Sequence, residues 1–357
     1  MNIAFDHMTL SQRVLFGTGK AVEHVTAAVE DLGARRLLLI HGTLNTQVVE
    51  AIAERTGVVH LIDEIVQHVP AANVAAATAD AVAADADAVI SIGGGSSTGL
   101  AKAVALRTGI PIIAVPTTFA GSEATDIWGI TEGRRKNTGA DPCVLPKVVV
   151  YDASLTSGLP RALAVASGLN AVAHAVDGLW APRADPINRA FGTEGLRALV
   201  PGLRSLVANP DDIQAREQML FGAYLAALAF ASAGSGLHHK ICHTLGGAFN
   251  LPHAEMHSIL LPYVTDFNAP FARDAENRIV SALGCLSAAA GLNTLRNELG
   301  ATPSLADIGL RETDIDNAAE LALPLVPASN PRPVTLPDLR RIIRAAWAGE
   351  PILGAEQ

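Results

Sequence analysis

The sequence predicts two domains. An α/β domain with a doubly wound, mostly parallel, Rossmann-like sheet is expected over residues 1–155, followed by an all-α helical domain over residues 156–357. Short unbroken apolar runs alternate with helical patterns up to Tyr151, as in parallel sheets whose strands are covered on both faces. Beyond Tyr151 the patterns are helical and no convincing strand follows. A length of 357 residues also exceeds what one hydrophobic core usually serves.

Each strand of the predicted sheet is recognised by its apolar run and by the turn residues after it. The clearest example is the run Leu37-Leu38-Leu39-Ile40, which leads into His41-Gly42-Thr43. The expected strands are 13–17, 36–40, 58–62, 88–92, 111–116 and 147–151, with helices over 19–32, up to 55, over 74–84 and over 100–107. A hairpin is expected where 127–131 and 136–138 flank a basic tip. The helical domain is expected to contain helices over 160–179, 186–207, 211–233 and 238–249, and further helices up to residue 348.

Composition excludes several classes of protein. A hydrophobic content of 49% with 17% charged residues indicates a folded chain, not a disordered one. A net charge of −9 argues against a nucleic-acid partner, because a phosphate backbone requires a basic surface. The three cysteines, Cys143, Cys242 and Cys285, lack CxxC spacing and form neither a disulfide framework nor a thiolate metal site.

One apolar stretch has to be weighed as a membrane span. No charged residue occurs in 219–237, but its many small residues are equally typical of a helix buried on all sides in a helical core. A single marginal span would also lack a partner. The beginning of the chain shows no signal-peptide pattern, so we expect a soluble, cytoplasmic protein.

Three loops that follow strands are candidates for binding a dinucleotide. Gly93-Gly94-Gly95-Ser96 lies between a strand and a helix start, where backbone amides and the helix dipole attract a pyrophosphate. It matches neither GxGxxG nor the P-loop, and a purely structural turn is the alternative. Thr117, Thr118 and Ser122 follow the next strand and are expected at the same sheet edge, where ligands bind in open sheets. The turn His41-Gly42-Thr43 has no acidic residue to hold a ribose hydroxyl, so NADH and NADPH both remain open.

Histidines are concentrated in one short stretch. Five of the eleven lie between positions 238 and 257, and His239 and His243 are spaced i, i+4 on one predicted helix. Such a group can bind a metal, shuttle protons or donate to an oxyanion, and the alternative is a set of hydrogen-bonded core residues. Asn170 and His174 are likewise spaced i, i+4. With His239 and His253 they offer one amide and three imidazoles, and an amide is a poor ligand for a divalent ion.

The densest basic cluster is Arg134-Arg135-Lys136. It is either a solvated hairpin tip or a site that captures substrate carboxylates or cofactor phosphates.

Taken together, these motifs resemble the iron-containing alcohol dehydrogenase family and, within it, the maleylacetate reductases. The stretches that carry the resemblance are Gly93-Gly94-Gly95-Ser96, Pro116-Thr117-Thr118 with Phe119-Ala120-Gly121-Ser122-Glu123, Ile127-Trp128-Gly129-Ile130-Thr131-Glu132-Gly133, Arg135-Lys136-Asn137-Thr138-Gly139, the Asn170/His174 helix, His238-His239-Lys240-Ile241-Cys242-His243, and His253-Ala254-Glu255-Met256-His257. The resemblance covers nearly the whole chain and is weakest after about residue 300.

The resemblance implies a dehydroquinate-synthase-like architecture with the active site in the cleft between the domains, binding of NADH or NADPH, and a homodimer. It places the family's metal ligands at Asn170, His174, His239 and His253. Because metal-dependent members have an aspartate where this chain has Asn170, we expect that no metal is required. The resemblance also places His243 near the nicotinamide.

The function expected from the resemblance is NAD(P)H-dependent reduction of the carbon–carbon double bond of maleylacetate to 3-oxoadipate, in the degradation of aromatic compounds. His243 and His253, with His174 or His239, are expected to donate to the enolate oxygen or the α carbon. Arg135 and Lys240 are expected to bind the substrate carboxylates, and Lys136 the cofactor. The alternatives are a metal-dependent alcohol dehydrogenase that reduces a carbonyl, and a lyase of the dehydroquinate-synthase type that returns its NAD unchanged. A non-enzymatic binding protein would not need this arrangement of loops and histidines.

Overall fold

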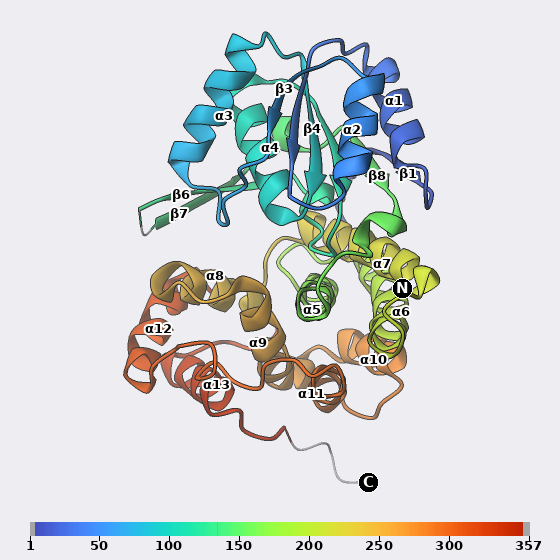
Figure 1. Ribbon diagram of the computed structural model, residues 1–357. Helices are drawn as coiled ribbons and strands as arrows, with labels where there is room; N and C mark the ends of the chain where they lie inside the picture. Colours follow the sequence, from blue (N-terminus) through green and yellow to red (C-terminus); the bar gives the residue numbers. More distant parts are fainter. Residues whose placement is uncertain (1–3, 134, 353–357) are drawn as a thin grey trace. The chain divides into compact units, whose positions relative to one another are not determined.

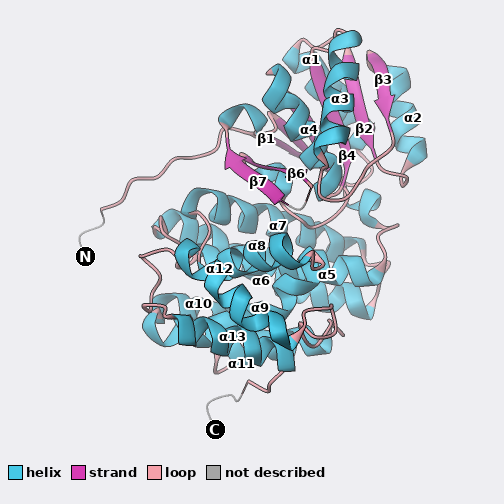
Figure 2. Ribbon diagram, turned by 90° about the vertical axis from the view of Figure 1, so that its left-hand side faces the viewer, coloured by secondary structure: helices cyan, strands magenta, loops and turns pink. Residues whose placement is uncertain are grey.

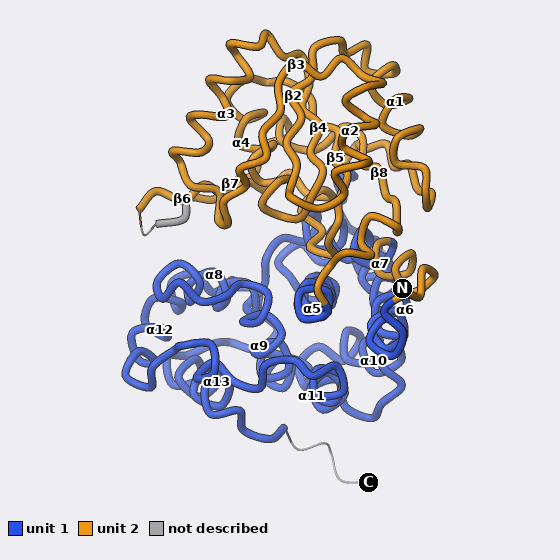
Figure 3. Tube along the Cα trace, viewed as in Figure 1, with its two compact units in different colours: residues 1–9, 161–210, 221–357 blue, residues 10–160, 211–220 orange. Residues whose placement is uncertain are grey.

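The chain divides into two compact units. The computed structural model describes residues 4–133 and 135–352, and for residues 135 and 136 it describes the backbone alone. One unit comprises residues 10–160 and 211–220, and the other comprises 1–9, 161–210 and 221–357 (Figure 3). Strands are confined to the first unit, and the second is built from helices (Figure 2). The two units are called the α/β unit and the helical unit below.

Two short segments belong to the other unit from the one that a single boundary between residues 155 and 156 would give them. Residues 1–9 belong to the helical unit, where His7 bonds Asp185 through its ring nitrogen at 2.7 Å. Residues 211–220 belong to the α/β unit, where Glu217 accepts from the Thr18 hydroxyl at 2.6 Å and Arg216 donates to the Thr156 carbonyl. These contacts join residues far apart in the chain, so no local pattern reveals them.

The predicted α/β sheet is confirmed. Six parallel strands lie in the order β1-β8-β5-β4-β2-β3, and β6 and β7 form a separate antiparallel hairpin. The strands are β1 (Arg13–Phe16), β2 (Leu37–His41), β3 (Val58–Ile62), β4 (Ala88–Gly93), β5 (Ile112–Pro116), β6 (Ile127–Glu132), β7 (Arg135–Ala140) and β8 (Val148–Tyr151).

Helices cover both faces of this sheet (Figure 1). Alternate side chains of β2 point to opposite faces, so Leu37 and Leu39 pack with α1 and α2 while Leu38 and Ile40 pack with α3 and α4. This two-sided burial explains why the strands are continuous apolar runs. The helices of the unit are α1 (Ala21–Leu32), α2 (Thr46–Arg55), α3 (Ala71–Ala83) and α4 (Gly95–Thr108), with short 3-10 turns at Ser122–Ala124 (η1), Pro142–Val144 (η2) and Ala153–Thr156 (η3).

Helix α4 begins five residues earlier than predicted. Gly95 and Ser96 form its first turn, so the glycine-rich loop proper is shorter than the sequence suggests. The first backbone N–H groups of a helix have no partner within it, and they are therefore free to face a ligand.

The helical unit contains α5, α6, α8 to α13 and the part of α7 from residue 221 onward. The helices are α5 (Arg161–Gly178), α6 (Pro186–Ala208), α7 (Ile213–Ala233), α8 (Leu237–Phe249), α9 (His253–Asn268), α10 (Arg273–Leu283), α11 (Ala288–Glu298), α12 (Ile315–Ala322) and α13 (Leu336–Ala348), with 3-10 turns at Ala269–Phe271 (η4), Glu312–Asp314 (η5) and Leu323–Leu325 (η6). Helix α9 packs against α5, α8, α11 and α13. A core of buried side chains from α8, α9, α12 and α13 fixes α8 and α9, which carry five of the histidines.

Two stretches of the described chain are long and apolar enough to cross a membrane. One is 273–298, and the other is the pair α7 and α8, which bends by 94° at its break. Buried core helices meet the same criterion, and Met219, Ala223, Ala226 and Ala227 of α7 are no more than 1% exposed within the protein. Burial of this kind matches the core-helix interpretation of 219–237.

Candidate active site

The predicted cofactor loops lie side by side at one edge of the α/β sheet. They follow β2, β4 and β5, which are adjacent strands. The register pairs His41 with Ile92 and Gly93 with Pro116, so all three strands end at nearly the same level. The Gly42 N–H donates to the Ile92 carbonyl at 3.2 Å, and the Thr117 N–H to the Gly93 carbonyl at 2.9 Å. The structure thus brings together His41-Gly42-Thr43, Gly93-Gly94-Gly95-Ser96 and Thr117-Thr118.

Two glycines of this edge have no room for a side chain. Gly93 has φ +155°, and a Cβ there would lie 2.3 Å from Ser97 Oγ. A Cβ on Gly94 would lie 2.8 Å from Thr118 Cγ2. Because Gly93 and Gly94 have no side chains, the backbone is accessible next to the first N–H groups of α4. Backbone N–H groups at a helix N-terminus bind phosphates in this arrangement. The residues of this edge therefore fit a dinucleotide.

A buried lysine near these loops was not predicted from the sequence. Lys102 of α4 is 1% exposed, and its ammonium donates to the carbonyl oxygens of Ser122 and Thr125 at 2.6 and 2.7 Å. Nearby, the buried Glu123 accepts from the Tyr151 hydroxyl at 2.7 Å. The sequence feature that could have indicated its burial is a single lysine in a helix that otherwise consists of small and apolar residues up to Arg107.

The histidines of the helical unit come from three helices. Asn170 and His174 lie on α5, His239 and His243 on α8, and His253 begins α9. His174 and His239 are stacked, with ring centroids 5.1 Å apart. The ring of His253 lies 6.1 Å from that of His243 and 4.4 Å from that of His257.

The orientation of His239 is fixed by Asp177, a residue one turn beyond His174 on α5. His239 Nδ1 lies 2.8 Å from Asp177 Oδ2. The same carboxylate accepts from the Gly236 N–H at 2.8 Å and from the Trp180 indole at 3.2 Å. Because Asp177 is surrounded by donors, the proton of neutral His239 belongs on Nδ1 and the lone pair on Nε2.

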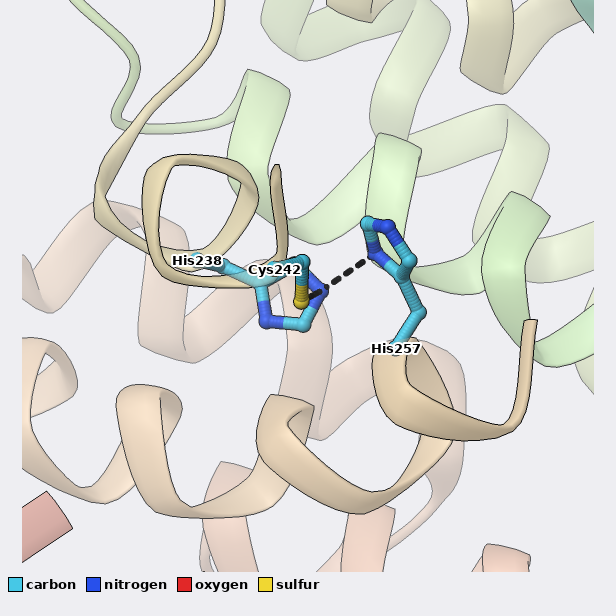
Figure 4. Close-up of side chains that lie close together, drawn as sticks. All are labelled: His238, Cys242 and His257. Carbon is cyan, nitrogen blue, oxygen red and sulfur yellow. Dashed lines mark hydrogen bonds between the residues drawn. The ribbon is translucent and has the colours of Figure 1, made fainter. Parts of the chain in front are cut away.

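A second buried contact joins His238, Cys242 and His257 (Figure 4). His238 Nε2 lies 2.9 Å from His257 Nδ1, and Cys242 Sγ lies 3.7 Å from His238 Nε2. Their ligand atoms lie within 4.8 Å of one another, the one such group of His, Cys, Asp or Glu found in the described residues. All three side chains are fully buried, and His238 Nε2 is the atom that the other two contact.

Burial keeps the buried histidines and the cysteine of this group neutral. Burial and, to a smaller extent, the neighbouring His243 together lower the pKa of His174 to about 4. Burial and neighbouring imidazoles also hold the pKa values of His238, His239 and His257 well below the ordinary value. Burial raises the pKa of the Cys242 thiol, which makes this cysteine a poor nucleophile. Burial raises the pKa of Asp177, and its N–H donors oppose that rise.

Several buried polar atoms around this group have no protein partner. They are Asn170 Oδ1, His174 Nδ1, His238 Nδ1, His239 Nε2 and His257 Nε2. Buried polar atoms are rarely left unpaired in native proteins, so a polar ligand is expected to bind them.

The same atoms fit a divalent ion poorly. Asn170, His174, His239 and His253 include no anionic ligand, and the carboxylate of Asp177 is engaged with His239. The ligand atoms of His174, His239 and His253 do not form a group within 4.8 Å in the described structure. An aspartate would offset part of the charge of a divalent ion, so a set of one amide and three imidazoles is expected to bind such an ion more weakly than a set that includes a carboxylate.

The remaining predicted residues are placed as follows. His243 is exposed on α8, and His253 and Lys240 are partly buried. The charge of Lys240 contributes to the lowered pKa of His239. Ser122 is partly exposed in the turn η1. Arg135 and Lys136 lie on β7, where their side chains are not described, and Arg134 lies outside the described residues.

Comparison with known proteins decides the family. Residues 11–153 match the iron-containing alcohol dehydrogenase family, and residues 164–347 match the C-terminal part of the same family. The chain belongs to the iron-containing alcohol dehydrogenase family. A maleylacetate reductase from Sphingobium indicum is 44% identical over 352 residues, covering 98% of this chain and 99% of the relative.

Solved structures agree with this assignment. An iron-containing alcohol dehydrogenase from Corynebacterium glutamicum superposes with a TM-score of 0.95 at 49% identity, covering 98% of this chain and 99% of that one. A maleylacetate reductase from Agrobacterium tumefaciens superposes with a TM-score of 0.92 at 40% identity, covering 97% and 99%. Both units of the chain are therefore similar to members of this family.

Proposed function

We propose that the chain catalyses the NAD(P)H-dependent reduction of the carbon–carbon double bond of maleylacetate to 3-oxoadipate, in the breakdown of aromatic compounds. The observation that carries this proposal is the full-length similarity to maleylacetate reductases, at 44% identity in the Sphingobium indicum relative. The amide at Asn170, where a metal-binding member would have an acid, supports the same conclusion.

The sheet edge of the α/β unit is the proposed cofactor site. NADH or NADPH, when bound, supplies the hydride. The bare backbone at Gly93 and Gly94 and the first amides of α4 hold its phosphates. No acidic residue occurs in His41-Gly42-Thr43, so the proposal covers both cofactors.

The histidines are proposed to handle the charge and the proton of the substrate. The alkene of maleylacetate is conjugated to a ketone, so hydride added β to the ketone leaves negative charge on the ketone oxygen. His243 and His253 can donate to that oxygen or protonate the α carbon. Because the lone pair of His239 lies on Nε2, this ring acts as an acceptor that orients a substrate or water proton. This assignment narrows the predicted donors to His243 and His253.

We propose that the reaction needs no metal ion. Hydride addition to the conjugated alkene leaves a delocalised enolate, whereas addition to an isolated carbonyl leaves a localised alkoxide, so the alkene needs less help from a Lewis acid. Arg135 and Lys240 remain the proposed partners of the substrate carboxylates, and Lys136 that of the cofactor. A cytoplasmic homodimer remains our prediction. The same regiochemistry predicts loss of chloride from a substrate halogenated at the attacked carbon.

The test is loss of reduced-nicotinamide absorbance on addition of maleylacetate, with 3-oxoadipate identified as the product. A lyase of the dehydroquinate-synthase type would leave that absorbance unchanged at the end of turnover. An alcohol dehydrogenase would instead reduce an unconjugated aldehyde or ketone and would lose activity on chelation. Absence of NADH and NADPH oxidation with maleylacetate would overturn the proposal.

A further inference from the structure

Lys102 is the starting point, because its charge is buried among backbone oxygens and not paired directly with an acid. Its ammonium donates to the carbonyls of Ser122 and Thr125 at 2.6 and 2.7 Å. It also lies 2.9 Å from the Thr125 hydroxyl and 2.9 Å from the Ile127 carbonyl. Only 1% of the residue is exposed.

Four oxygen atoms around one nitrogen suit an ammonium and not a neutral amine. An ammonium has three donors and no acceptor, whereas an amine has a lone pair that needs a donor of its own. Burial lowers the pKa of Lys102 to about 7, and the charges of Glu123 and Asp126 oppose that effect. The fold therefore keeps a costly buried charge at this position.

The carbonyls that Lys102 binds belong to one segment. They lie in the stretch that starts with Thr117 after β5 and ends at Ile127, the first residue of β6. That stretch packs directly on the glycine-rich loop, because a Cβ on Gly94 would meet Thr118 and a Cβ on Gly95 would lie 3.7 Å from Ala120. Displacement of the segment would therefore disturb the glycine-rich loop that is proposed to bind the cofactor phosphates.

We propose that Lys102 is a positioning residue for dinucleotide binding and acts as a built-in monovalent cation for the segment between Ser122 and Ile127. When the lysine side chain is shortened, the same carbonyls form a binding site for a free ammonium ion. The inference rests on the proposed function to the extent that this sheet edge binds NADH or NADPH.

The experiment compares Lys102→Ala with the wild type. The dissociation constant of NADH and of NADPH is measured by fluorescence, without maleylacetate, in sodium chloride and in ammonium chloride at equal ionic strength. We expect Lys102→Ala to weaken binding by about tenfold or more in sodium chloride, a change of about 1.4 kcal/mol. Ammonium is expected to restore most of the lost affinity, and to leave the wild type unchanged.

Two control variants separate positioning from general destabilisation. Lys147→Ala removes an exposed lysine of the same unit. Arg216→Ala removes a second buried cation, one that donates to the Thr156 carbonyl outside the cofactor loops. Neither is expected to respond to ammonium. Wild-type affinity in folded Lys102→Ala would overturn the proposal, as would a loss of affinity that ammonium does not reverse.

If Lys102→Ala folds in neither salt, Thr125→Val decides. It removes one of the four acceptors while the lysine stays in place. Weaker dinucleotide binding with unchanged far-UV circular dichroism would support the proposal, and unchanged binding would overturn it. If the wild type binds neither NADH nor NADPH, the proposed function fails together with the role of Lys102. If the wild type binds but ammonium has no effect on Lys102→Ala, only the role of Lys102 fails.

Discussion

Asp177 and His239 form a buried carboxylate–imidazole pair, with Oδ2 and Nδ1 2.8 Å apart and neither side chain more than 2% exposed. Two neighbouring N–H donors, from Gly236 and Trp180, hold the carboxylate in place. The pair directs His239 Nε2, which has no protein partner, away from Asp177. Orienting partners of this kind determine which ring nitrogen carries the proton.

Replacing Asp177 with asparagine should slow turnover without unfolding the protein. The amide can donate to Nδ1 and would then favour the opposite tautomer, so we expect kcat to fall by roughly 10- to 100-fold. The dissociation constant of NADH should not change. Asp185→Asn is the matched control, because Asp185 also accepts from a histidine in the same unit but caps α6. An unchanged kcat in folded Asp177→Asn would show that His239 needs no orientation.

An alanine at Gly94 should weaken cofactor binding. Its Cβ would lie 2.8 Å from Thr118 Cγ2, so the two loops would have to separate. We expect the dissociation constant of the dinucleotide to rise by about tenfold, or about 1.4 kcal/mol. At Gly158 a Cβ has ordinary contact distances of 3.8 Å or more, which makes Gly158→Ala the control. Equal affinities for the two variants would exclude the glycine-rich loop from the cofactor site.

Changing Asn170 to aspartate should create a site for a divalent ion. The new carboxylate would supply the anionic ligand that His174 and His239 lack. Titration calorimetry with Zn²⁺ should then show tighter binding than in the wild type. Tight binding of Zn²⁺ by the wild type, lost in His239→Ala, would contradict the poor fit described for the native residues.

Acid should destabilise the helical unit, because the buried His174 is neutral in the folded state. The pKa of His174 is about 4 in the folded state, whereas the ordinary pKa of a histidine, which applies to the unfolded chain, is 6.5. Between these values the unfolded chain binds the proton and the folded chain does not, so stability falls as the pH drops. This one group accounts for up to about 3 kcal/mol by pH 4, at about 1.4 kcal/mol per pKa unit. Urea unfolding between pH 7 and pH 4.5 measures the effect, and a flat free energy of unfolding would contradict neutral buried histidines.

The architecture was predictable because its signals are local. Runs such as Leu37–Ile40 report burial on both faces within a few residues, and the i, i+4 spacing of Asn170 and His174 places them on one helix face. The contacts that refine the site are not local. Asp177 meets His239 across 62 residues, and Lys102 meets the Ile127 carbonyl across 25. Side-chain pairing over such separations leaves no periodicity in the sequence, so these roles required the folded structure.

The most direct test is the initial rate of NADH or NADPH oxidation with maleylacetate, measured before and after exhaustive chelation of the enzyme. We predict that the nicotinamide is consumed at the same rate in both preparations and that 3-oxoadipate accumulates. No oxidation in either preparation would contradict the proposed reaction. Activity that is lost on chelation and restored by zinc or iron would contradict the metal-free account of Asn170 and its histidines.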